Sequence, residues 1–215
     1  MTDDAQLDKP MIVNWALAEL GLQPAFSIDD STGLGRQVAI FWPRAVGHCF
    51  GLHDWTFCRQ TFQLQRQSAT PQTGYAYGFD LPGSRIGQPV KLLEDPRRQT
   101  PIRDSRIEGQ TLFCDEPTAY AVCKVPVAPE IWDLQWADAF AVALAYYLSI
   151  PLTQDPDLAE LKKRDAFGTP SEGGTGGLFG RLIAQDRAAG PVGAPMLAED
   201  PLTAGRTSGP WHGRW

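Results

Sequence analysis

The chain has 215 residues, enough for one medium-sized domain and an appendage. With 43% hydrophobic and 20% charged residues it has the composition of a globular protein. Its net charge of −6 excludes a global basic field that would attract nucleic acid or anionic lipid. The start, Met-Thr-Asp-Asp, has neither the basic nor the apolar segment of a secretory signal. Seven tryptophans predict large packing surfaces, inside the monomer or between subunits.

Two helices are predicted in the first quarter of the chain. Apolar spacing predicts the first over residues 6–22, with Pro10 in its first turn, where a missing N–H costs least. Its predicted apolar stripe consists of Leu7, Met11, Trp15, Ala18 and Leu22. The second helix is expected over residues 31–53, with a kink or a break at Pro43.

Residues 56–125 read as an inserted unit of antiparallel strands. Alternating polar and apolar residues predict a strand over 56–66, and a segment rich in turn formers follows at 68–88. Further short strands are predicted at 90–93, 102–107, 111–114 and 119–125. Glu108-Gly-Gln110 predicts a tight hairpin turn between two of these strands.

A long alanine-rich segment at residues 133–150 predicts the central helix of the domain. It is apolar on nearly all sides, so other elements must surround it. Its run of consecutive apolar residues is shorter than the roughly 20 that are needed to cross a bilayer. A fourth helix is expected at 156–167, capped by Asp155. The predicted fold is therefore α+β: a helical bundle over residues 1–168 interrupted by an inserted antiparallel β unit. Without βαβ alternation, a parallel nucleotide-binding sheet is not expected.

The last 47 residues, 169–215, contain 10 Gly and 5 Pro, a composition typical of chains that do not fold alone. We expect them to form an extended C-terminal arm with a flexible glycine hinge at 173–177 and a short helix at 178–189. Because Trp and Arg anchor interfaces, Trp211, Arg214 and Trp215 predict that the arm orders against a partner. The alternative is that it packs along its own domain. Removing residues 169–215 is expected to leave a folded domain.

No motif for catalysis, metal binding or cofactor binding emerges: there is no GxSxG, HExxH or P-loop. The four cysteines contain no CxxC pair, so buried thiols in a reducing cytosol are expected. His48, Cys49, His53 and Cys58 are close in sequence, but His48 and Cys49 point to different sides of the predicted helix and His53 lies near its end, so a shared metal site is not expected. The carboxylates of the strand region, such as Glu94 and Glu108, fall at turns or strand ends, where solvated charges are expected.

A series of short motifs is similar to one known family. In chain order they are Trp15-Ala-Leu-Ala-Glu-Leu-Gly21, Ile28-Asp-Asp-Ser-Thr32, Leu52-His-Asp-Trp55-Thr-Phe57, Gly74-Tyr-Ala-Tyr77 leading to Leu81-Pro82, and Trp136-Ala-Asp-Ala-Phe-Ala-Val-Ala-Leu-Ala145. Their order and spacing over about residues 11–167 resemble the head-to-tail adaptor of tailed bacteriophages, also called tail tubular protein A. Such proteins usually run the fourth helix longer, and the glycine-rich tail is unusual among them.

The resemblance implies a non-enzymatic virion protein without metal or cofactor, made in the bacterial cytoplasm and placed at the head–tail junction, with no membrane contact. Twelve copies would form a ring under the portal protein and prolong the channel for DNA, which passes without sequence-specific binding. An acidic chain suits that sliding. The β unit would face neighbouring copies or the tail nozzle, and the arm would reach the portal. Its implied contact residues are Leu178, Phe179, Arg181, Trp211, Arg214 and Trp215.

Two other functions remain open from the sequence. The first is a virion-associated peptidoglycan hydrolase, because a catalytic pair of carboxylates cannot be recognised by spacing. The strand region offers Glu94, Asp95, Asp104, Glu108, Asp115 and Glu116, and Glu94 and Glu108 are the pair chosen for mutation. The second is a cellular protein-binding module with a flexible tail, unrelated to phage.

Overall fold

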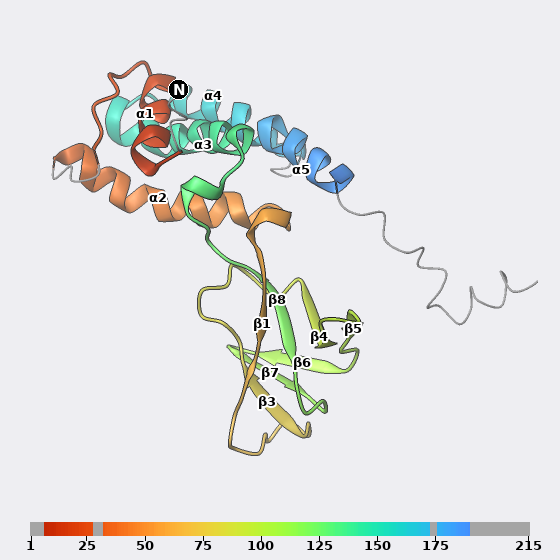
Figure 1. Cartoon of the computed structure of the whole chain (residues 1–215). Helices are drawn as coiled ribbons and strands as arrows, with labels where there is room; N and C mark the ends of the chain where they lie inside the picture. The colour runs from red at the N-terminus through yellow and green to blue at the C-terminus, as the bar shows by residue number, and fades with distance from the viewer. Residues whose placement is uncertain (1–6, 28–31, 173–175, 190–215) are drawn as a thin grey trace, which may run out of the picture.

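The computed structural model describes residues 7–27, 32–172 and 176–189, so the predictions on Trp211, Arg214 and Trp215 lie outside the described residues. Within these ranges the predicted α+β class is confirmed: helices form one unit, and two antiparallel sheets form a second unit inserted between the second and third helices (Figure 1). The helices are α1 (Lys9–Glu19), α2 (Gly33–Gly51), α3 (Leu134–Thr153), α4 (Pro156–Phe167) and α5 (Gly177–Ala189).

Helix α3 is the centre of the helical unit and packs against all four other helices. The Asp133 carboxylate caps its start by accepting hydrogen bonds from the backbone N–H of Gln135 and Trp136 (2.9 and 3.3 Å). The helix runs three residues beyond the predicted end because Pro151 is accommodated in its last turn. Among the described helices it alone is long and apolar enough to cross a membrane, but most of it is buried by its neighbours, as in a core helix.

The first two helices correct the sequence predictions in detail. The predicted stripe of α1 is wrong: Ala18 is exposed, and the face toward α3 is formed by Ile12, Val13, Ala16 and Leu17. Both faces of α1 are apolar at helical spacing, so periodicity could not identify the buried one. Helix α2 is not broken at Pro43, because the proline lies on the exposed side, where the missing N–H removes one hydrogen bond without a buried clash.

The β unit consists of two four-stranded antiparallel sheets around its own core. One sheet has the order β1 (Arg59–Gln63), β8 (Tyr120–Lys124), β4 (Lys91–Asp95), β5 (Thr100–Pro101). The other has the order β2 (Gln65–Arg66), β3 (Tyr77–Asp80), β7 (Thr111–Cys114), β6 (Ser105–Glu108). The predicted hairpin is confirmed: Glu108 pairs with Thr111 across a two-residue turn in which Gly109 has a φ of 59°. The buried core residues are Leu64, Phe79, Leu81, Leu112, Cys114, Ala119, Ala121 and Cys123.

Three strand predictions are wrong in part. The strand predicted at 102–107 is shorter than expected: residues 102–104 lie outside any strand, and β6 begins at Ser105. The predicted strand at 56–66 begins with a 3-10 turn (Thr56–Cys58) and is divided between both sheets. Strand β3 was not predicted, because it lies within the segment 68–88, which is rich in turn-forming residues. A Cβ at Gly78 would lie 3.0 Å from Gln67 Oε1 and 3.3 Å from the Phe113 ring, so glycine allows a close approach there.

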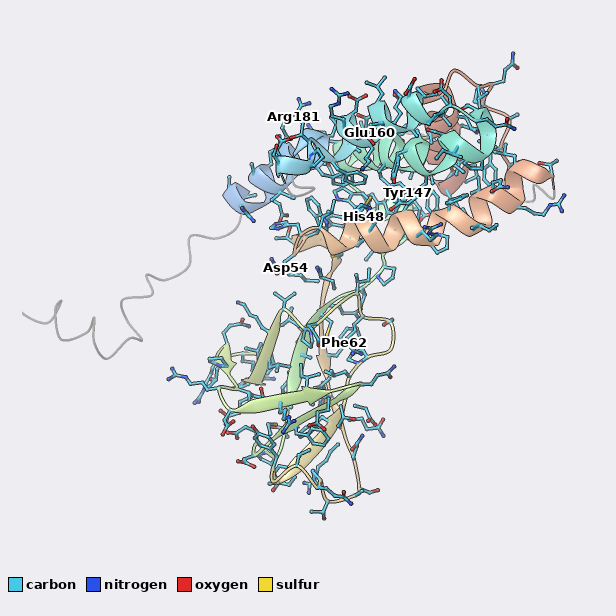
Figure 2. All side chains as sticks on the ribbon, turned by 180° about the vertical axis from the view of Figure 1, so that it is seen from behind. His48, Asp54, Phe62, Tyr147, Glu160 and Arg181 are labelled. Atoms are coloured by element: carbon cyan, nitrogen blue, oxygen red, sulfur yellow. The ribbon has the colours of Figure 1, made fainter. Side chains whose placement is uncertain are left out.

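The β unit is joined to the helices by a narrow neck, where the chain enters through the 3-10 turn and β1 and leaves through β8 (Figure 1). A buried lysine holds this neck. Lys124 Nζ donates to the His53 carbonyl oxygen (3.2 Å) and lies 3.3 Å from the Asp54 carboxylate. Figure 2 shows Asp54 at the junction between the two units. The backbone N–H of Val125 also donates to the Cys58 carbonyl (3.0 Å), so the entering and leaving segments are bonded to each other.

We expect Asp54→Asn to lower the free energy of unfolding by ~2 kcal/mol, because it leaves the Lys124 ammonium buried without its counter-ion. Lys124→Met removes the charge itself and should cost clearly less. Urea denaturation of both variants measures the difference. Equal losses, or a larger loss for Lys124→Met, would show that the ion pair does not determine the stability of the neck.

Candidate partner-binding surface

Helix α5, predicted to belong to the arm, is part of the helical core. The Phe179 side chain is completely buried and Ile183 is 4% exposed. The Phe179 ring stacks on Phe167 with centroids 5.5 Å apart, and lies about 6 Å from the rings of Trp136 and Trp55. The prediction that Phe179 contacts a partner is therefore wrong, because a buried side chain offers no free surface. The domain continues to Ala189, and removing residues from 169 onward would open its core.

The glycine segment before α5 is also different from its prediction. Residues 173–175 lie outside the described residues, but Gly176 and Gly177 form a tightly packed turn rather than a hinge. The Gly176 N–H donates to the Phe167 carbonyl (3.0 Å), and Gly177 has a φ of 59°. A Cβ at Gly177 would lie 2.5 Å from the Asp165 carbonyl oxygen. Here α5 can follow α4 closely only because no side chain is present.

A carboxylate stabilises the same turn. Glu172 Oε2 accepts hydrogen bonds from the backbone N–H and the hydroxyl of Thr169 (2.6 and 2.8 Å). The backbone hydrogen bond is the main reason why the pKa of Glu172 is lowered. The ionised carboxylate therefore helps to hold the turn above the ordinary pKa of a glutamate, and this contribution is lost as the pH falls through the lowered value.

A second carboxylate ties α5 to the neck. Asp186 accepts hydrogen bonds from the Thr56 hydroxyl and backbone N–H (2.7 and 3.3 Å), and its other oxygen lies 3.1 Å from His53 Nε2. We call this contact the neck latch. The arrangement is not a hydrolytic triad, because the hydroxyl bonds to the carboxylate and not to the imidazole. No sequence signal pointed to it, since Asp186 is 130 residues away from Thr56.

The opposite side of α5 borders a surface groove of about 700 Å³ between α1, α3 and α5. The residues of α5 that line it follow each other at helical spacing, on a different side from Phe179 and Ile183. The apolar lining is Trp15, Ala18, Leu134, Ala139, Leu178 and Leu182, and the polar lining is Glu19, Gln135, Asp138, Arg181 and Gln185. Two of the predicted contact residues, Leu178 and Arg181, thus meet in one groove, which the sequence alone did not predict.

The polar rim of the groove is only partly neutralised from within the chain. Glu19 forms an ion pair with Lys162 (2.6 Å). Neither Asp138 nor Arg181 forms an ion pair with another residue that the structure describes. Figure 2 shows Arg181 on the side of α5 that points away from α2. An apolar floor with one acidic and one basic group at its edge suits a segment that carries apolar side chains and at least one charge.

The residues considered for metal binding do not converge. His48 Nδ1 lies 2.8 Å from the Tyr147 hydroxyl, whereas His53 contacts Asp186. Burial raises the pKa of Cys58 to about 11 and that of Cys49 well above its usual value, so both thiols are protonated and unreactive. In the described ranges, no group of three or more His, Cys, Asp or Glu side chains could hold a metal ion.

The two hydrolase candidates are also apart. Glu94 lies on β4 and Glu108 on β6, in different sheets. Glu108 pairs with Arg106 (2.8 Å). The described part of the strand region therefore offers no observation in favour of hydrolysis.

No protein-family model and no curated protein matches the chain.

We expect Phe179→Ala to destabilise the protein by about 3–5 kcal/mol, because it leaves a cavity among Phe167, Trp136 and Trp55. Arg187→Ala, on an exposed position of the same helix, is the control and should change stability by less than about 0.5 kcal/mol. Thermal and urea unfolding measure both. If Phe179→Ala behaves like the control, α5 is not part of the cooperative domain.

Gly177→Ala should destabilise the protein by at least about 1–3 kcal/mol, since it combines a left-handed backbone with a contact to the Asp165 carbonyl. The matched substitution Gly47→Ala, in open space within α2, should instead stabilise by about 0.5–1 kcal/mol. Calorimetry of both variants tests the packed turn. An unchanged melting temperature for Gly177→Ala would favour the flexible hinge that the sequence predicts.

Proposed function

We propose that this protein is the head-to-tail adaptor of a tailed bacteriophage, which attaches as a ring to the portal and carries the next tail component. The observation that supports the proposal most is the arrangement of the chain. Two helices are followed by an antiparallel β unit on a narrow neck, and then by the central and fourth helices. This is the order in which the motifs that resemble the adaptor family occur.

The distribution of exposed apolar side chains supports a role for the helical unit in subunit contacts. Five large hydrophobic residues in the described ranges are strongly exposed, and none of them belongs to the β unit. They are Ile40 on α2, Ile131 before α3, Leu134 and Ile150 on α3, and Leu161 on α4. In the proposed ring, the helices contact neighbouring copies and the β unit points toward the tail.

Residues 190–215 supply the proposed contact with the portal. They start from α5, which the aromatic core and the neck latch fix on the domain. A chain of 26 residues can extend to about 90 Å, so its indoles can reach a partner well beyond the helical unit. Arg181 and Leu178 lie on the exposed side of the same helix and remain candidates for the same contact. The entropic cost of ordering the arm on the portal is offset by the burial of its indoles and by the multiple copies in the ring.

A chain ending at Ala189 should keep the fold but lose attachment to portal rings. Native mass spectrometry of portal rings mixed with the full chain should show an added mass of twelve chains of 23.6 kDa. The shortened chain should add none. Trp211→Ala and Trp215→Ala should each weaken binding by ~2 kcal/mol or more, about thirtyfold in Kd.

The two parts of this proposal fail separately. If the chain ending at Ala189 binds portal rings with unchanged affinity, the arm is not the contact. If the full chain does not bind portal rings at all, the adaptor function is wrong. The control is an unchanged unfolding curve for the shortened chain, since it retains the buried Phe179 and Ile183.

A further inference from the structure

The groove between α1, α3 and α5 leaves apolar side chains exposed to solvent. Leu134 is 62% exposed at one edge, and Leu178 and Leu182 line the opposite wall. Leu178 and Leu182 are partly buried against the helical core, and the side of each that lines the groove stays open among the described residues. In water, an apolar groove of this size favours any segment that can fill it, at roughly 25 cal/mol for each Å² buried.

The chain itself continues from one wall of this groove. Helix α5 ends at Ala189, about one turn after the groove residue Gln185. Trp211 follows 22 residues later, after a segment rich in Gly and Pro. A random coil of 22 residues has a root-mean-square span of about 25 Å, somewhat more than the ~20 Å length of α5. The end of the chain therefore reaches the groove without strain, at an effective concentration in the millimolar range.

The chemistry of the last residues fits the groove. Trp211 and Trp215 offer two large amphipathic rings, and Arg214 lies between them in sequence. Asp138, which has no ionic partner among the described residues, stands on the rim next to Leu134. An arginine at that rim gains a carboxylate partner, and an indole between Leu134 and Leu182 covers the exposed apolar surface.

From this match we propose that, in the free protein, residues 211–215 occupy the groove of their own chain, with an indole between Leu134 and Leu182 and Arg214 beside Asp138. The proposal goes beyond the adaptor function, because it concerns the isolated chain. A partner that takes the arm must first displace it from the groove. Self-docking thus keeps the indoles away from other molecules until a stronger binding site is offered.

Paramagnetic relaxation measures this docking in the full chain. The four native cysteines are buried, so a spin label attaches only to an introduced thiol at Ala184, an exposed residue of α5 beside the groove. In a ¹⁵N-labelled sample, the indole N–H signal of Trp211 or Trp215 should lose most of its intensity. Leu134→Arg should restore the signal, because a charge then occupies the apolar edge. Ile150→Arg, at an equally exposed site at the other end of α3, should not.

Mixing identifies where the arm binds. When unlabelled, spin-labelled chains are added to ¹⁵N-labelled chains without spin label, the indole signals should stay unchanged. Intensity loss in this mixture would show that the arm docks on a second copy, and would overturn the proposal. No loss in the single-chain sample, or a loss that Leu134→Arg does not relieve, would also overturn it. No portal is present, so these outcomes leave the adaptor function untouched.

Discussion

The aromatic cluster around Trp136 is the contact on which the rest of the molecule depends. Its ring lies 4.7 Å from that of Trp132, 4.8 Å from that of Phe50 and 5.4 Å from that of Phe57. These rings come from the central helix, the second helix and the neck, and Phe179 adds the fifth helix. Because one cluster fixes all four segments, neither the neck nor α5 can move without disturbing the core of the helical unit. Edge-to-face geometry predominates, which adds about 0.5–1.5 kcal/mol per pair beyond burial.

This cluster also explains the high tryptophan content. Trp42, Trp55, Trp132 and Trp136 pack on one another or on the phenylalanines between them. Trp15 is partly buried and lines the groove. Five of the seven tryptophans therefore act within the described domain, and only Trp211 and Trp215 remain for the arm. The five described tryptophans thus serve the packing of the domain itself and the lining of its groove.

Capping residues and apolar periodicity in the sequence predicted most helices and strands. Which side chains are buried, paired or exposed depends on contacts between distant segments, which the sequence pattern does not show. Helix α4 was predicted over its observed range because Asp155, Pro156 and Gly168 mark both ends chemically. Strand β3 was missed because its identity depends on pairing with β2 and β7 and not on its own residues. Phe179 was assigned to the arm because the surrounding glycines outweighed a short apolar pattern. The groove and the neck latch join segments more than a hundred residues apart, so no spacing rule could reveal them.

The way in which the β unit is attached has a consequence for the evolution of such a chain. Its first and last strands pair, so that Arg59 lies opposite Lys124, and one backbone hydrogen bond joins Cys58 to Val125. The 66 residues between Cys58 and Val125 therefore form a loop whose two ends are bonded to each other at the helical unit. Changes inside it, away from Ile86, which packs against the helical core, leave the meeting point of the second and third helices in place. Selection can thus change the β unit to suit new neighbouring proteins while the helical unit stays the same.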